Sequence, residues 1–514
     1  MKNPFKAVNV GKNAEVVYTH NALEAGQGLH TTSDEAALQV QGSVEVPKPY
    51  HVFGLNLYPY RHPRVQTAML GFVIFLTVGM YHVITAMGGA GQQTATLADG
   101  ANITLYTVFT VFCFVSPACL NYFGMRATLC FGAVGYAAYA SSLWCYNRTG
   151  NEGFVYFGGA WNGLSAAFLW TADRTGISAY ATEDKKGLYV SIFWTVFQVG
   201  TVVGSAIPVG QNWNAGVGNK STVSDGTYIG LFILMITGAC VALLLYPMTK
   251  MVREDGTRVT LPAQLTWLEQ LRASWQVLKD HKYIMWMWPY AWAINYYSIY
   301  QNNRYNSPVF TVRGRALNTL MSGIAQIFSA WVMLIMTDKL PLNRRHRAYV
   351  GLAFVWLLVN GVNIGGYFAM VETKFGLKES QKLDVYTPGY GPKAFLYVMY
   401  GFMDGCYNTF GLWFIGALSN DRRELSVYFS MFTFWQSACT VCAYALDFRG
   451  VSHQFMFGSS WGFLAFGPLC LLPIIKWYMK ETNIIKAADL ALDGQDMATD
   501  PTATAVKETA FVKE

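Results

Sequence analysis

Twelve long apolar blocks, separated by mostly short polar segments, run along this chain. A helix needs about 20 apolar residues to cross the hydrocarbon core of a bilayer. The blocks that reach this length are residues 65–87, 102–121, 127–146, 154–172, 187–208, 227–248, 283–303, 316–337, 348–371, 394–416, 425–446 and 455–477. The pattern therefore predicts an all-α polytopic membrane protein with twelve transmembrane helices.

The composition agrees with this interpretation. Of the 514 residues, 53% are hydrophobic and only 13% are Asp, Glu, Lys or Arg, against about 25% in an ordinary soluble protein. A soluble protein of this size needs more charge to cover its surface. The composition thus disfavours a soluble enzyme, a disordered scaffold and a coiled coil, and it makes the lipid bilayer the first expected partner.

The positions of the basic residues predict the orientation. With the N-terminus in the cytoplasm, 27 of the 37 Lys and Arg residues fall on the cytoplasmic side, as the positive-inside rule requires. Both termini are then cytoplasmic, and the net charge of +7 gives no reason to invoke nucleic acid. Arg304, Arg313 and Arg315 run against the bias, because they fall together on the outer side of the seventh helix.

Three N-glycosylation sequons, at Asn102, Asn147 and Asn219, fall in the predicted outer loops one, three and five. Glycans attach only on the luminal or external face. The sequons therefore agree with the charge count and predict a glycoprotein of the plasma membrane or of a secretory or endosomal organelle.

The predicted helices divide the chain into five parts. Residues 1–64 form a polar, cytoplasmic N-terminal tail without a cleavable signal peptide. Two six-helix bundles, 65–248 and 283–478, flank a central cytoplasmic loop, 249–282. Within that loop, Leu268, Leu271, Trp275 and Leu278 have the spacing of an amphipathic helix. Residues 479–514 are predicted to be a disordered cytoplasmic tail.

A short sequence echo relates the two bundles. The fourth helix contains Gly159-Ala-Trp-Asn162-Gly163 and then Leu169-Trp170, and the tenth contains Gly401-Phe-Met-Asp404-Gly405 and then Leu412-Trp413. Parallel repeats of this kind characterise the pseudo-symmetric 6+6 major facilitator fold, whose substrate site lies near the membrane midplane between the halves. The echo therefore predicts that fold.

Asp404 is the sharpest candidate for chemistry. It lies about 16 Å into the tenth helix, near the middle of the bilayer. A carboxylate is costly there unless it is paired, protonated or faces a wet cavity. It is therefore expected to couple transport to protons or cations, or to act as a substrate counter-ion. A protonated Asp that hydrogen-bonds a neighbouring helix is the structural alternative.

Further polar residues inside the bundle are candidates for a substrate or ion site, or for hydrogen bonds between helices. They are Asn162 in the fourth helix, Trp292, Asn295 and Tyr297 in the seventh, and Gln436 in the eleventh. Gln198 and Gln326 are expected to join helices. Asp338, Arg344 and Arg345 in the loop after the eighth helix are expected to hold the cytoplasmic side together.

The remaining charged and sulfur-containing motifs carry no predicted chemistry. Asp173-Arg174 and Asp421-Arg422 are read as solvated loop charges, and Cys439-x-x-Cys442 as packing. No nucleotide-binding loop, zinc motif or nucleophile elbow is present. The sequence therefore predicts neither a metal site, nor a cofactor, nor an enzyme.

Several stretches resemble the uncoordinated-93-like (ion channel regulatory) family, a branch of the major facilitator superfamily. The span Gly159 to Thr171 resembles its fourth helix, and Phe310-Thr-Val-Arg313-Gly-Arg315-Ala-Leu317-Asn318 is similar to its segment between helices seven and eight. Asp404 and Trp435-Gln436-Ser437 also look like family positions. The resemblance covers roughly residues 66–478 and implies the major facilitator fold.

One departure concerns the loop between helices two and three. Many facilitators carry an Asp there before Gly-x-Arg, but this chain has Asn121-Tyr-Phe-Gly124-Met-Arg126. Arg126 remains a candidate gating charge without its acid.

Two functions follow as expectations. The first is a secondary transporter of a small organic solute, working by alternating access and coupled to protons. The alternative is a non-transporting regulator or trafficking chaperone that binds another membrane protein, because the resemblance implies both kinds of family member.

Overall fold

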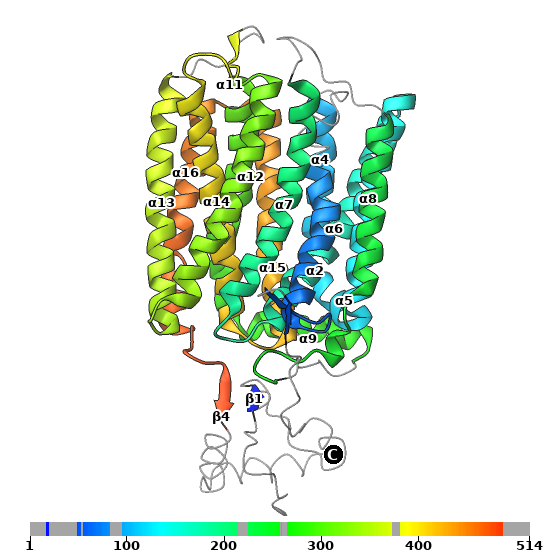
Figure 1. Ribbon diagram of the computed structural model, residues 1–514, viewed down its shortest axis with the longest axis vertical. Coiled ribbons are helices and arrows are strands. Elements are labelled where there is room, and N and C mark those ends of the chain that lie inside the picture. Colours follow the sequence, from blue (N-terminus) through cyan, green and yellow to red (C-terminus); the bar gives the residue numbers. More distant parts are fainter. Residues whose placement is uncertain are drawn as a thin grey trace, which may run out of the picture.

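A computed structural model describes residues 17–19, 49–52, 55–82, 95–213, 225–257, 259, 265–372 and 381–486. Its helices run side by side as one bundle (Figure 1). The helix α9 lies across one end of this bundle and α11 lies at the other. These are called the α9 end and the α11 end below.

The first helix group precedes residue 245. Its members are α2 (Pro63–Ile74), the π-helical turn η2 (Phe75–Gly79), α4 (Ala95–Phe112), α5 (Ser116–Thr149), α6 (Glu152–Tyr180), α7 (Lys186–Asn212) and α8 (Asp225–Leu244). The segment that follows holds η3 (Met248–Lys250) and α9 (Trp267–Asp280).

The second helix group begins after α9. Its members are η4 (Lys282–Met287), α10 (Trp288–Ile299), η5 (Tyr300–Asn306), α11 (Ser307–Val309), α12 (Val312–Leu334), η6 (Ile335–Lys339), α13 (Arg344–Glu372), α14 (Tyr390–Leu418), α15 (Arg422–Phe448), α16 (His453–Leu469) and α17 (Leu472–Trp477). Two short antiparallel pairs complete the described elements: β1 (Val17–Thr19) with β4 (Ile484–Lys486), and β2 (Tyr50–Val52) with β3 (Leu55–Leu57).

Wherever the structure describes them, the twelve predicted ranges lie largely on helical residues. Six described helices are individually long and apolar enough to cross a membrane, and a seventh qualifies when the bent pair α4–α5 is counted as one span. The prediction of an all-α membrane protein is therefore confirmed, and the number of twelve crossings stays a prediction.

The helix α5 contains parts of two predicted helices, and Gly124 marks the kink between them. Its φ of +81° lies in the left-handed region, which glycine adopts without the steric cost of a Cβ. Residues 116–123 and residues 125–149 are therefore two helical segments that meet at Gly124. A single residue makes this turn, where the sequence predicted a loop of several.

The glycines of the sequence echo have the same packing role in both helix groups. A Cβ on Gly163 of α6 would lie 2.1 Å from the carbonyl oxygen of Leu105 in α4. A Cβ on Gly405 of α14 would lie 1.9 Å from Ser329 Oγ in α12. Small residues let helices approach this closely inside a membrane. The echo thus marks two equivalent helix contacts.

The predicted amphipathic helix is α9. A capping box starts it, because the Thr266 hydroxyl and the Glu269 carboxylate satisfy each other's backbone N–H groups. Leu268 and Trp275 remain 65% and 56% exposed. Leu271 and Leu278 are partly buried, and Leu278 packs against the core. Half of the apolar stripe is therefore exposed, as expected for a helix at a membrane surface.

The start of the predicted C-terminal tail is ordered against the bundle. Glu481 accepts a hydrogen bond from the N–H of Arg344 at 2.8 Å, and the N–H of Asn483 donates to Glu183 at 2.8 Å. Residues 487–514 lie outside the described residues, as does most of the N-terminal tail.

Candidate functional site

A buried arginine joins the two helix groups. Arg174 of α6 donates from one terminal nitrogen to Thr433 Oγ1 at 2.7 Å and to Gln436 Oε1 at 2.8 Å, both on α15. Its guanidinium carbon lies 4.8 Å from the ring centre of Trp170 and 5.6 Å from that of Phe432. The side chain is only 8% exposed.

The surroundings of Arg174 compensate its charge only in part. Aromatic faces and neutral oxygens stabilise a buried guanidinium, but no carboxylate of the described residues lies within 4.0 Å of it. Its Nε is buried without a hydrogen-bond acceptor. Because arginine stays protonated, the junction of α6 and α15 carries a permanent positive charge.

The reading of Asp173 and Arg174 as solvated loop charges is wrong. The helix α6 continues to Tyr180, eight residues beyond its predicted end, so both residues lie inside it. Asp173 is fully buried, and neither of its carboxylate oxygens has a hydrogen-bond partner among the described residues. The sequence contained one signal that the helix continues, because no proline occurs in residues 173–180.

Gln436 connects Arg174 to the predicted seventh helix. Its side chain accepts from Arg174, and its carbonyl oxygen accepts from Asn295 Nδ2 at 3.3 Å. On the same face of α10, the carbonyl of Trp292 accepts from the Cys439 thiol at 2.7 Å. The structure thus brings three predicted site residues, Gln436, Asn295 and Trp292, into one contact region with Arg174.

Tyr297 lies on another side of α10, and Asp404 lies on the separate helix α14. Tyr297 is buried, and its hydroxyl is 2.9 Å from both Gln301 Oε1 and the carbonyl oxygen of Tyr400. Asp404, in α14, is half-buried and accepts a hydrogen bond from Asn408 Nδ2 at 3.1 Å. This donor lies one turn along the same helix, and no cationic side chain lies within 4.0 Å of Asp404 among the described residues.

Asn162 is not part of the Arg174 region. It lies twelve residues before Arg174, about 18 Å along α6. Its side chain is 1% exposed, and its Oδ1 has no hydrogen-bond partner among the described residues. The interior amides Gln198 and Gln326 hydrogen-bond each other between α7 and α12, which confirms their predicted role in joining helices.

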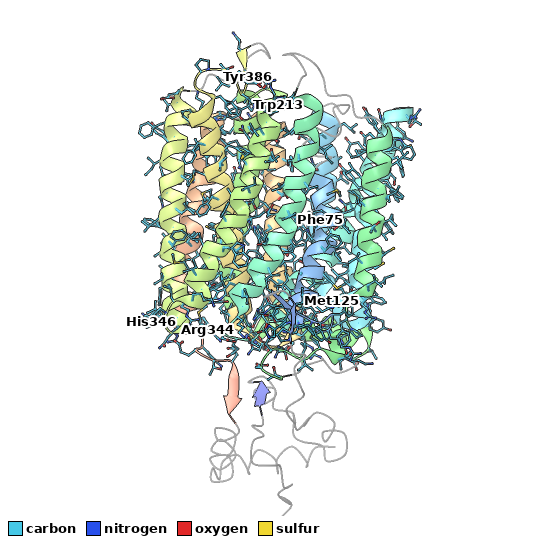
Figure 2. The ribbon with its side chains drawn as sticks, in the orientation of Figure 1. Phe75, Met125, Trp213, Arg344, His346 and Tyr386 are labelled. Carbon is cyan, nitrogen blue, oxygen red and sulfur yellow. The ribbon has the colours of Figure 1, made fainter. Side chains whose placement is uncertain are left out.

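The predicted loop charges gather at the α9 end. Asp338 accepts hydrogen bonds from the N–H groups of Gly187 and Leu188, at 3.0 and 2.7 Å, and so caps the first turn of α7 from the other helix group. Arg344, labelled in Figure 2, forms an ion pair with Glu183 at 3.1 Å. Arg345 donates to the carbonyl oxygen of Met479 at 2.7 Å.

Glu183 and Lys186 complete this end. Burial alone would raise the pKa of Glu183, but Arg344 and the hydrogen bonds from residues 482 and 483 outweigh it and hold that pKa below its usual value. Lys186 donates to Asn420 Oδ1 and to the carbonyl oxygen of Ser419, each at 2.8 Å. A cavity of about 430 Å³ lies beside these charges, lined by Glu183, Thr337, Arg344, Arg347 and Trp413 among others.

Asp421 and Arg422 are also not solvated loop charges. Asp421 is the N-cap of α15 and accepts from the N–H groups of Arg423 and Glu424. Arg422 is 5% exposed and donates to the carbonyl oxygen of Leu120 at 2.9 Å. Arg126 is half-buried, and its Nε has no acceptor among the described residues.

A second contact between the helix groups lies at the α11 end. Arg313 pairs with Asp384 and donates to the carbonyl oxygen of Trp213 at 2.6 Å. Its guanidinium lies over the rings of Trp213 and Tyr386, both labelled in Figure 2. The ion pair holds the pKa of Asp384 below its usual value. Arg313 is one of the three arginines that run against the predicted cytoplasmic bias of basic residues.

The three sequons differ in their surroundings. Asn102 lies inside α4, is 9% exposed, and accepts a hydrogen bond from the Tyr81 hydroxyl at 3.4 Å. A buried helical side chain is a poor glycan acceptor, so the structure speaks against Asn102. Asn147 is half-exposed in the last turn of α5. Asn219 lies outside the described residues.

Comparison with known proteins identifies relatives of the chain. The family model "Ion channel regulatory protein UNC-93" matches residues 99–448. An UNC93-like protein of Schizosaccharomyces pombe is 33% identical over 440 residues, covering 82% of this chain and 87% of the relative.

Solved structures show the same fold at low sequence identity. The proton:xylose symporter XylE matches with a TM-score of 0.55 and 12% identity, over 82% of this chain and 97% of its own. The transporter FucP, in its outward conformation, matches with a TM-score of 0.56 and 13% identity, over 81% and 99%. Both are major facilitator proteins, which confirms the predicted fold.

Proposed function

The chain belongs to the UNC-93 family and has the major facilitator fold, and from that premise we propose that it transports a small organic solute by alternating access. The protein is integral to the membrane. We place both termini and the α9 end in the cytoplasm, on the charge count. The division into two six-helix bundles joined by residues 249–282 is part of this proposal.

The single observation that carries the proposal is the Arg174 region. A permanent charge inside a membrane protein is costly, and such residues usually mark a substrate or ion pathway. Arg174 lies where the two helix groups meet, and its main partners are a neutral amide and a hydroxyl. A solute group that replaces these partners would bind both helix groups at once.

The contacts at the two ends suit the alternation that such transport needs. At the α9 end, Asp338 and Arg344 each bridge the helix groups. At the α11 end, Arg313 reaches Trp213. Opening one end must break its contacts, and closing it restores them. Each end is held by a small number of polar contacts. The free energies of its open and closed states can therefore differ by only a few kcal/mol, as alternation requires.

In this proposal Asp404 couples transport to protons. Its only hydrogen bond from a described side chain comes from the neutral amide of Asn408. A carboxylate without a cationic partner inside a membrane favours the protonated form, so it can gain or lose a proton when water reaches it.

Uptake into proteoliposomes tests the proposal. The purified protein is reconstituted, and radiolabelled sugars, amino acids, carboxylates and organic cations are offered with and without a pH gradient. We expect at least one class to enter faster than into protein-free liposomes, and Arg174→Gln to abolish that uptake. Asp404→Asn should remove the effect of the pH gradient. Uptake unchanged by Arg174→Gln would exclude the proposed site.

A regulator that binds another membrane protein is the second candidate, because the matched family is described by ion channel regulation. It predicts no uptake of any class and recovery of a stable membrane-protein partner by detergent pull-down. It also predicts that Arg174→Gln leaves partner recovery unchanged, because that side chain is buried.

A further inference from the structure

Two of the contacts between the helix groups at the α9 end differ in the side chain that approaches the start of the opposite helix. In the first, Asp338 accepts hydrogen bonds from two backbone N–H groups at the start of α7. In the second, Asn121 approaches the start of α15, and its Nδ2 donates to Ser426 Oγ at a long 3.5 Å. The neutral amide of Asn121 therefore occupies the second contact, whereas the negatively charged Asp338 occupies the first.

Unpaired hydrogen-bond donors surround this second contact. The Nε atoms of Arg126 and Arg422 and the hydroxyl of Tyr180 are all buried and have no acceptor among the described residues. Arg422 reaches the residue before Asn121 in α5, since it donates to the Leu120 carbonyl oxygen. Tyr180 interacts electrostatically with both arginines. Three donors from α5, α6 and α15 are therefore close enough to interact, and Asn121 Oδ1 beside them also lacks a hydrogen-bond partner among the described residues.

The nearby acids form no close ion pair with these arginines, although Asp421 stabilises the charge of Arg422. Asp421 caps α15, and burial raises its pKa. Glu424 accepts from Ser419 Oγ at 2.5 Å and lies 3.3 Å from His281 Nε2. Asp173 interacts electrostatically with Tyr180 and Arg174, and neither of its carboxylate oxygens has a hydrogen-bond partner among the described residues. Among the described residues, no carboxylate oxygen lies within 4.0 Å of Arg126 or Arg422.

Unpaired buried donors are rare in native proteins, and an unseen water or ion is a common explanation. A phosphate group matches these donors, because arginine binds it well and its oxygens accept several hydrogen bonds. We propose that the region between Asn121, Arg126, Tyr180 and Arg422 binds a phosphate-type anion. The anion supplies the negative charge that Asp338 supplies at the first contact, and so stabilises the closed α9 end.

The surroundings allow two sources for this group, an anionic lipid headgroup or free phosphate. Tyr122 and Phe123, next to Asn121, are 53% and 61% exposed, and both rings contact Trp267 of α9. Exposed aromatic side chains of this kind are typical of the membrane interface. Met125, which precedes Arg126, also lies at the α9 end (Figure 2). The site is thus at the level of lipid headgroups.

Thermal unfolding of the full-length protein distinguishes the sources. In neutral detergent, about 5 mM inorganic phosphate is compared with chloride at equal ionic strength. In nanodiscs, phosphatidylcholine alone is compared with phosphatidylcholine containing phosphatidylglycerol. Binding should raise the unfolding midpoint by roughly 2–6 °C. A rise with phosphate identifies the free anion, and a rise only with phosphatidylglycerol identifies the lipid. No rise in either arm overturns the proposal.

Three variants connect the response to this region. Asn121→Asp supplies the missing charge, so its midpoint should start higher and respond less than half as much as that of the wild type. Arg126→Gln should lose the response, and it is preferred to Arg422→Gln because Arg126 is only half-buried and less needed for folding. Arg272→Gln, in exposed α9, is the matched control and should respond like the wild type. Equal responses in all three variants would place the anion elsewhere.

Discussion

Removing the Asp338 carboxylate should loosen the α9 end without unfolding the protein. The carboxylate accepts two N–H groups at the start of α7, 3.0 and 2.7 Å away, and it belongs to the opposite helix group. Loss of a helix N-cap costs about 0.5–2 kcal/mol, and the interaction of a negative charge with the helix dipole adds about 0.3–1 kcal/mol.

The two substitutions of Asp338 should therefore differ. Asp338→Asn keeps one acceptor oxygen and loses the charge, which is worth about 1 kcal/mol. Asp338→Ala loses both hydrogen bonds, worth about 2 kcal/mol. If these contacts exist only while the α9 end is closed, the open population rises about 5-fold and 30-fold, since 1.4 kcal/mol is a factor of ten.

Hydrogen exchange of the purified protein measures this opening. Exchange of the backbone amides in residues 183–190 and 416–421 should quicken in the order wild type, Asp338→Asn, Asp338→Ala. Asp255→Asn is the matched control, because Asp255 is at the same end and, within the described part of the chain, its carboxylate accepts hydrogen bonds only from Thr257 in its own loop. If Asp338→Ala exchanges like this control, the carboxylate does not hold the two helix groups together.

Three further predictions concern stability and modification. The Glu254 carboxylate is half-buried, which by itself raises its pKa, but Arg64, Lys185 and Tyr189 outweigh this and lower the pKa from 4.5 to about 2. Glu254→Gln should therefore lower the free energy of unfolding at pH 7 by about 1–2 kcal/mol, and the difference should shrink as the pH falls from about 4.5 towards 2; a difference independent of pH would contradict the ion pair. Gly163→Ala should destabilise the protein by about 1–3 kcal/mol in chemical denaturation, because its Cβ would meet a carbonyl oxygen, whereas Gly230→Ala, with open space around it, should be neutral or stabilising. In glycosidase gel-shift assays, Asn147→Gln should remove a glycan and Asn102→Gln should not; a shift lost on Asn102→Gln would show that this side chain is accessible.

The structure also explains where the sequence-based predictions erred. The pattern of apolar blocks located the helices well, but it ended α6 at residue 172 because two charges follow. Charged residues end an apolar block in hydropathy, yet they do not end a helix, and α6 runs on to Tyr180. The same error turned Arg174, which is buried between α6 and α15, into a predicted surface charge.

The sequence by itself determined the class of this protein, because long apolar blocks have few stable arrangements other than packed membrane helices. It also determined the echo of glycines, since only a residue without a side chain permits such close helix contacts. It could not determine which polar residues meet, because partners such as Arg174 and Gln436 are 262 positions apart. Only the tertiary structure brought them together, and only there do Asn121 and Asp338 each meet a helix of the opposite group.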